Sequence, residues 1–150
     1  MSVSPRWNES LTGLASVLSE LAASAIEPIL ATHGAGFGTF DLLAAVRAAE
    51  GRESQGQIAT RLGIAPSSLT EAVASAVKKG FVEQLVVASN QRSRRLMLTR
   101  EGERLLDACL EELGRVEERV RSAIGDGRSA AAIETLKLAV DALAANQAAP

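Results

Sequence analysis

The sequence predicts a mainly α-helical fold with one small β-hairpin, and three observations predict it. Apolar residues recur three or four positions apart over most of the chain, which is the period of helices that pack along one face. Residues 82–98 instead carry the β-branched and apolar content of strands. Residues 54–79 form two short periodic segments separated by Gly63, which is typical of two helices joined by a tight turn.

The N-terminal third predicts two helices. Residues 10–31 form the first, because leucines and alanines recur there at helical spacing, and Pro28 is expected either to kink or to end it. The glycine-rich residues 33–38 are expected to be a loop. Their glycine spacing and their position after a helix argue against a phosphate-binding loop. Residues 39–50 predict a second helix that ends at Gly51.

The clearest local signals lie in residues 54–79. Ser54 followed three residues later by Gln57 is a capping box, so a helix is expected to begin there. Gly63 accepts the left-handed backbone that ends a helix, and Pro66 suits the first turn of the next one. Two short helices joined by a glycine turn are typical of a helix-turn-helix, whose second helix enters the major groove of DNA.

The second helix of this pair has two different faces. Leu69, Val73 and Val77 repeat every four residues and are expected to pack inward. The opposite face carries hydroxyl and charged groups, namely Ser67, Ser68, Thr70, Glu71 and Lys78. Such side chains can bond base edges and phosphates, and the helix N-terminus adds a partial positive charge. This face is therefore the candidate DNA-reading surface.

Two strands are expected over residues 82–88 and 94–98, joined by polar turn residues at 89–91. Leu96 and Leu98 fall on one face of the second strand, which is expected to be buried. The hairpin would extend from the end of the helix pair as a wing.

The charge of the chain is unevenly distributed. The formal net charge is −2, yet residues 78–104 hold seven cationic and three anionic side chains, so this segment carries +4 and the rest −6. A basic patch on an acidic body is the electrostatic footprint of a nucleic-acid binder. The alternative is a hairpin tip whose charges are simply solvated. Its position directly after a helix-turn-helix favours a contact with phosphates or a groove.

The C-terminal region predicts a long helix over residues 99–124, capped by Thr99, and a last helix that begins at Ser129. Both carry heptad-like apolar seams. Each seam either faces its own chain's core or interdigitates with a second chain. A helix about 39 Å long outreaches a small domain, which favours a dimer. Cys109 lies on the seam, where a cysteine is usually an inert small core residue and only rarely a redox sensor.

Composition excludes several other classes of protein. A chain of 150 residues suits one domain with a real core. No secretion signal and no apolar run of about 18–20 residues is apparent, so no membrane partner is expected. The single cysteine excludes an intrachain disulfide and fits a cytoplasmic protein. Paired histidines, zinc motifs and a nucleophile elbow are missing, so neither an enzyme nor a metal or cofactor is expected.

Four segments together resemble the multiple-antibiotic-resistance regulator (MarR) family of bacterial transcription factors. They are FDLLAAV at 40–46, SQGQIATRLGIAPSSLT at 54–70, VKKGFVE at 77–83 and NQRSRRLMLTREGERLL at 90–106. The resemblance implies one domain over 1–150. Within it, a winged helix-turn-helix would occupy 37–105, and dimerisation helices would occupy 10–36 and 106–146. It further implies a homodimer that binds a pseudo-palindromic operator in duplex DNA, most simply as a repressor released by a small aromatic ligand.

The candidate DNA-binding residues are Ser54, Gln55, Ser67, Ser68, Thr70, Glu71, Arg92, Arg94 and Arg95. Arg92 stands where the family carries its wing arginine, which implies a minor-groove contact. Two positions depart from the family. Glu71 repels phosphate unless it accepts from a cytosine amino group, and Asn90 replaces the usual wing aspartate. These departures leave an alternative open, namely a winged-helix dimer that senses a ligand or binds proteins and has little DNA affinity.

Overall fold

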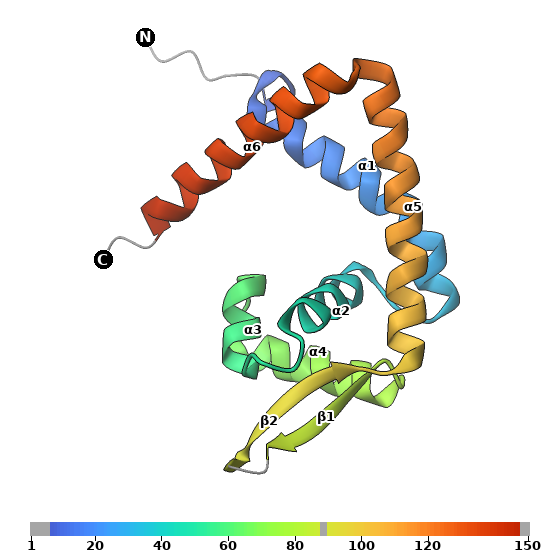
Figure 1. The fold of residues 1–150 in the computed structure, drawn as a ribbon, viewed down its shortest axis with the longest axis vertical. Coiled ribbons are helices and arrows are strands. Elements are labelled where there is room, and N and C mark those ends of the chain that lie inside the picture. Colours follow the sequence, from blue (N-terminus) through green and yellow to red (C-terminus); the bar gives the residue numbers. More distant parts are fainter. Residues whose placement is uncertain (1–6, 88–89, 148–150) are drawn as a thin grey trace. The chain divides into compact units, whose positions relative to one another are not determined.

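The computed structural model describes residues 7–87 and 90–147, except for the side chains of residues 8, 87, 90–93, 146 and 147. Its elements are a 3-10 turn η1 (Trp7–Glu9), helices α1 (Leu11–Thr32), α2 (Phe37–Ala49), α3 (Gln55–Leu62) and α4 (Pro66–Lys78), strands β1 (Val82–Val87) and β2 (Asn90–Leu98), and helices α5 (Arg100–Ile124) and α6 (Asp126–Gln147) (Figure 1). A mainly helical fold with a β-hairpin wing is therefore confirmed. The chain divides into two compact units, Met1–Leu113 and Gly114–Pro150, and α5 runs from one into the other.

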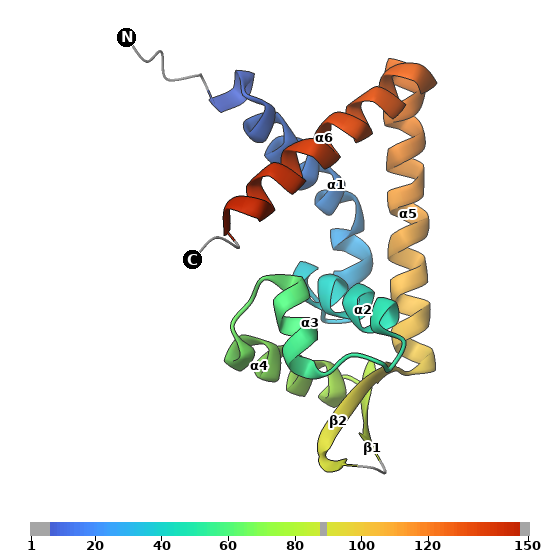
Figure 2. The same cartoon turned by 60° about the vertical axis from the view of Figure 1, so that its left-hand side comes forward.

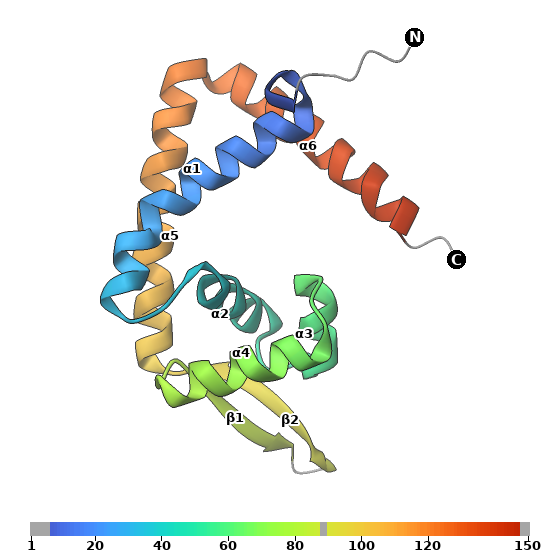
Figure 3. The same ribbon diagram turned by 180° about the vertical axis from the view of Figure 1, so that it is seen from behind.

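The first unit has one hydrophobic core, to which every long element in it contributes. Figures 1 and 3 show α2 between α3 and the first half of α5. In both views α4 lies below α2, and the hairpin lies below α4. The largest fully buried side chains are Ile26, Leu30, Leu42, Leu43, Val46, Ile58, Leu69, Val73, Val82, Leu96, Leu105 and Leu106. The helix-turn-helix and the wing are thus held by the same core, which fixes their relative positions.

Several expected boundaries shift by a few residues. Helix α1 continues through Pro28 to Thr32, one residue beyond the expected end at Ala31, so of the two alternatives for Pro28 the end of the helix is excluded, since the proline ring removes one ladder bond without removing the neighbouring ones. Helix α2 begins at Phe37, two residues earlier than expected. Helix α6 begins at Asp126, directly after Gly125, so the expected start at Ser129 is also wrong. A side chain such as Asp126 at the start of a helix is favoured by the helix dipole.

The hairpin is longer than the sequence indicated. Strand β2 begins at Asn90, so the expected strand over 94–98 is too short and the expected turn at 89–91 is wrong in part. Residues 88 and 89 lie outside the described part of the chain. The pairing runs from Val82 opposite Leu98 to Val86 opposite Arg94, and an irregularity follows at Val87. Because backbone groups make the ladder, polar side chains do not stop it.

One residue of α4 lies on a different face from the one expected. Val77 is 41% exposed, and Ala76, only 2% exposed, takes the inward position. A four-residue step advances about 40° beyond a full helical turn, so a strict repeat from Leu69 drifts away from the core by its third member. Leu69 and Val73 are buried as expected.

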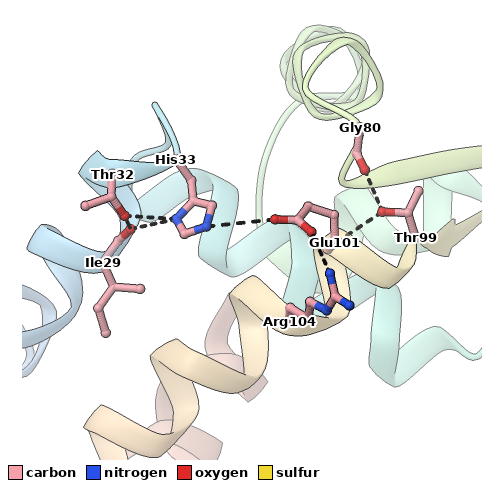
Figure 4. A network of polar contacts seen from close by, with 8 residues as sticks. Ile29, Thr32, His33, Gly80, Thr99, Glu101 and Arg104 are labelled. Atoms are coloured by element: carbon pink, nitrogen blue, oxygen red, sulfur yellow. Dashed lines mark hydrogen bonds and ion pairs between the residues drawn. The ribbon is translucent and has the colours of Figure 1, made fainter.

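A cluster of polar contacts ties the end of α4 to the start of α5 (Figure 4). The Thr99 hydroxyl donates to the Gly80 carbonyl at 2.5 Å and accepts from the Gly102 amide at 3.1 Å, so Thr99 caps α5 as expected. His33, at the end of α1, places Nε2 4.0 Å from Glu101 Oε1. This corner holds the first residues of the wing against two helices.

Large apolar side chains remain exposed on α1 and α6. On α1 they are Leu11, Leu14, Val17, Leu18 and Leu21, and on α6 they are Ile133, Leu138, Val140 and Leu143. Contrary to expectation, α1 is long and apolar enough to cross a membrane by length and composition alone. Exposed apolar patches of this kind mark surfaces that bind another protein or a membrane.

The close approach of α5 to Phe81 generates a stability prediction. A Cβ atom at Gly102 would lie 2.1 Å from the Phe81 carbonyl oxygen, and that backbone cannot move aside without disturbing the wing. Gly102→Ala should therefore lower the free energy of unfolding by about 1–3 kcal/mol, the usual cost of overpacking. Denaturant unfolding followed by circular dichroism measures it.

Gly114→Ala, on the same helix, is the matched control. Nothing lies within 4 Å of the Cβ it would add, so its better helix propensity should raise stability by up to about 1 kcal/mol. Equal effects of the two substitutions would contradict the close contact at Gly102.

Cys109 generates a second prediction. Its side chain is fully buried, and burial raises the pKa of its thiol above the ordinary value of 9.0. Iodoacetamide at pH 8 should alkylate the native protein at least about tenfold more slowly than the unfolded chain. As the pH rises, the thiol ionises in the unfolded chain before it ionises in the folded protein. The stability gained from burying the neutral thiol should therefore be lost as the pH rises above 9. Equal alkylation rates would restore Cys109 as a candidate sensor.

Candidate nucleic-acid interface

Helix α4 separates a buried face from an exposed one. Leu69, Val73 and Ala76 pack into the core, and Pro66 occupies the first turn without a side-chain cap from Ala65. Besides Pro66, the exposed residues are Ser67, Ser68, Thr70, Glu71, Ala74, Ser75, Val77 and Lys78. Four of the candidate DNA-binding residues therefore lie on the open side of one helix. Short side chains dominate this face, so another surface can approach the helix closely.

The candidate residues of α4 differ in the hydrogen bonds that their side chains make within the protein. The Thr70 hydroxyl donates to the Pro66 carbonyl at 2.9 Å, so toward a ligand it offers its oxygen as an acceptor. No hydrogen bond from Ser67, Ser68 or Glu71 to another side chain occurs within the described residues. These three groups face solvent.

A hollow of about 350 Å³ lies where α3, α4 and the wing meet, and its lining residues are Gln55, Thr70, Ala74, Val77, Lys78 and Gln84. Figure 3 shows α4 lengthwise across the unit with β1 and β2 beside it, and Figure 2 shows the hairpin projecting at the α4 side. The hollow offers two amides, one hydroxyl and one ammonium group. Amides and ammonium groups can donate to phosphate or base oxygens.

The wing arginines have different surroundings. Arg94 is exposed, and its Nη1 donates to Gln84 Oε1 at 2.9 Å, so its guanidinium lies beside the hollow. Arg95 points the other way: it is half-buried, and its Nη1 donates to the Arg52 carbonyl at 2.7 Å. That bond anchors the wing to the segment before α3. The side chain of Arg92 lies outside the described part of the protein.

The start of α3 is built as the capping box requires. The backbone N–H of Gln57 donates to Ser54 Oγ at 3.3 Å, and the backbone N–H of Ser54 donates to the side-chain oxygen Oε1 of Gln57 at 2.8 Å. The Ser54 hydroxyl oxygen is therefore engaged as a cap, whereas Gln55 is half-buried and lines the hollow. Nearby, Arg61 hydrogen-bonds Glu53 and holds the pKa of that carboxyl below its ordinary value.

The basic segment is less concentrated in space than in sequence. Lys79 donates to the Gly34 carbonyl, and Arg104 pairs with Glu101 at 3.4 Å. Among the cations whose side chains are described, Lys78 lines the hollow, and Arg94 bonds Gln84 at its edge. A negatively charged phosphate group would therefore meet a few well-placed cations instead of a broad basic surface.

Sequence reasoning did not select two residues of this site. Lys78 was placed on the polar face of its helix but was not named as a contact, and Gln84 was not singled out. Lys78 lies seven residues after Glu71, close to two full helical turns. Gln84 lies two residues after the buried Val82 and shares its strand face. Both signals were present in the spacing.

A second hollow of about 400 Å³ lies beside the end of α1. Its lining is largely apolar and includes Leu30, Ala31 and Phe37, and it also carries the carboxylates of Glu20 and Glu27. Largely apolar hollows with a few polar groups are the usual shape of small-molecule sites.

Comparison with known proteins adds a family model and solved structures. A helix-turn-helix domain of the IclR type matches residues 39–85. A search of curated protein sequences finds no significant match. Solved structures match over most of the chain. CouR from Rhodococcus jostii RHA1 bound to p-coumaroyl-CoA is 23% identical with a TM-score of 0.71, and the match covers 89% of this chain and 94% of that one.

Two more structures have the same arrangement. CouR bound to a 23-mer DNA duplex is 21% identical with a TM-score of 0.75, and the match covers 93% of this chain and 99% of that one. The apo form of MarR from E. coli is 19% identical with a TM-score of 0.69, and the match covers 87% of this chain and 96% of that one. The chain therefore has the winged helix-turn-helix fold found in MarR-family regulators.

Proposed function

We propose that this chain, which has the MarR-type fold, is a transcriptional regulator of that family and binds duplex DNA as a homodimer. The observation that carries the proposal is the shared hollow of α4, α3 and the wing, lined by Gln55, Thr70, Lys78 and Gln84. A helix and a hairpin that border the same hollow can contact one duplex together. Helix α4, as the recognition helix, and the wing would then contact different parts of the DNA.

In this proposal α4 enters the major groove and the wing follows the adjacent backbone. Ser67, Ser68 and Thr70 sit in the first turns of α4, where short hydroxyl side chains reach phosphates and base edges. Arg92 and Arg94 on the wing supply charge, and a narrow A·T-rich minor groove attracts arginine. Arg95 instead supports the wing through the Arg52 carbonyl.

Dimerisation is supported by apolar surface that the described residues leave uncovered. Leu14 and Leu18 of α1, and Val140 and Leu143 of α6, are all more than 40% exposed. A two-fold dimer would present two copies of α4 about 34–36 Å apart, which matches one turn of DNA and a pseudo-palindromic operator. Repression is the simplest consequence, because a dimer bound at an operator blocks access to that DNA. A DNA ligand and a single cysteine fit a cytoplasmic protein.

The hollow beside α1 is the proposed site for an effector. Its apolar lining suits an aromatic ring, and CouR, a structural neighbour, is described in complex with p-coumaroyl-CoA. The carboxylates of Glu20 and Glu27 favour a ligand whose polar end is neutral or cationic. A ligand at this place would contact both α1 and the start of α2, so it could alter how the two helices pack.

A ligand-sensing or protein-interaction module with little DNA affinity is the alternative function. It would be favoured by a recognition helix that is buried or that faces away from the wing. Ser67, Glu71 and Lys78 are instead exposed, and Arg94 bonds Gln84, which lines the same hollow as α4. The geometry therefore favours DNA binding.

Lys78→Gln and Arg94→Gln test the proposed DNA surface. Each removes one cation beside the hollow, so each should weaken DNA binding to all sequences alike. Each should also reduce, by about 1, the steepness with which the logarithm of the association constant falls with the logarithm of the salt concentration. Fluorescence anisotropy with duplexes from the region upstream of the gene, at two or more salt concentrations, gives both quantities.

Lys137→Gln on α6 is the matched control, since it removes the same charge from a lysine paired with Glu134 outside the proposed surface. Its affinity and salt slope should equal those of the wild type. Loss of affinity in all three variants alike would show only a net-charge effect and would contradict the assignment of the hollow. Absence of binding by the wild type at low salt would reject the DNA function.

Leu18→Glu and Ser19→Glu test the dimer surface. Both positions are exposed on α1, but Leu18 lies on its apolar face and Ser19 lies about 100° around the helix. Leu18→Glu should shift the protein toward monomer in analytical ultracentrifugation because it buries a charge in the interface. Ser19→Glu should leave the dimer intact, and equal behaviour of the two variants would contradict this surface.

A further inference from the structure

We infer that Glu71 selects a cytosine on the floor of the major groove, at one position in each half-site of the operator. The inference rests on the proposed function, because it requires α4 to enter that groove. It goes further by assigning a base to a side chain whose charge is otherwise a disadvantage on a DNA-facing helix.

Glu71 lies on the line of α4 that is furthest from the core. Successive helical residues turn by 100°, so Glu71 is about 140–160° around the axis from the buried Leu69, Val73 and Ala76. The same outer line contains Ser67, Ala74 and Lys78, spaced four, three and four residues apart. If the buried face of α4 points away from the duplex, this outer line points at the groove floor.

No positive charge neutralises Glu71 on its own helix. The residues one turn away are Ser67, Ser68, Ala74 and Ser75, and all of them are small and uncharged. The Glu71 side chain makes no hydrogen bond or ion pair with another described residue. The small neighbours let the helix backbone approach the groove closely, which brings the carboxylate to base edges before it reaches the phosphates at the groove rims.

The chemistry of a carboxylate restricts what it can meet there. An ionised glutamate only accepts hydrogen bonds. In the major groove guanine presents two acceptors and thymine one acceptor, so both repel it, whereas adenine places its N7 acceptor next to its amino group. Cytosine presents an amino donor without such an acceptor beside it. Of the four bases, cytosine is therefore the one that a carboxylate at this place favours.

The substitution Glu71→Gln tests this directly. A glutamine amide both donates and accepts, so it matches the N6 and N7 edge of adenine. Selection from a random duplex library should yield, for the wild type, a motif with C·G at one symmetric position. The preference should be about 5- to 150-fold, the range of a single base contact. Glu71→Gln should change that position to A·T and leave the others unchanged, and Glu71→Ala should leave it without preference.

Glu83→Gln is the matched control, because it removes the same charge from an exposed position on β1. It should raise affinity for all sequences and keep the wild-type motif. If the wild type selects a motif that Glu71→Gln and Glu71→Ala both retain, the inference is overturned and the DNA function stands. If the wild type selects no motif at low salt, the inference and the proposed function both fail.

Discussion

The structure depends on the burial of one face of α4. Leu69, Val73 and Ala76 are almost fully enclosed by side chains from the other elements of the first unit. Burying three apolar side chains supplies several kcal/mol, far more than the surface groups of the same helix. Because the helix is rigid and turns by 100° per residue, fixing this face also fixes the direction of Ser67, Glu71 and Lys78. The exposed chemistry of α4 is thus set by its core contacts.

The wing depends on the same core through a different set of contacts. Val82 and Leu96 are buried. The Thr99 hydroxyl donates to the carbonyl of Gly80 and accepts from the backbone N–H of Gly102. Arg95 adds a bond to the Arg52 carbonyl. These contacts hold the hairpin at its base. Charged groups then act from a framework that is already positioned, which lowers the entropic cost of binding a duplex. If the chain binds DNA as proposed, this pre-positioning would offset its small number of cations.

Sequence patterns predicted the helices, the capping box, the glycine turn and the paired strands because these features depend on local backbone chemistry. Val77 was misplaced because a four-residue repeat drifts around a helix, and the extent of β2 was missed because backbone pairing continues through polar residues. The separate surroundings of Arg94 and Arg95 could not be read from the sequence. Alternation indicates opposite strand faces, but the register that brings Arg94 to Gln84 on β1 and the packing that brings Arg95 to the Arg52 carbonyl are features of the folded chain.

The proposed function requires that α4 and the wing present one surface, repeated in a two-fold dimer, to a single face of duplex DNA. Hydroxyl-radical footprinting of the DNA selected by the wild-type protein tests this most directly. A dimer bound in this way should give two protected stretches related by symmetry, with centres about one helical turn apart, and flanking protection from the wings. A single protected stretch, or uniform cleavage of DNA that the protein retains, would contradict it.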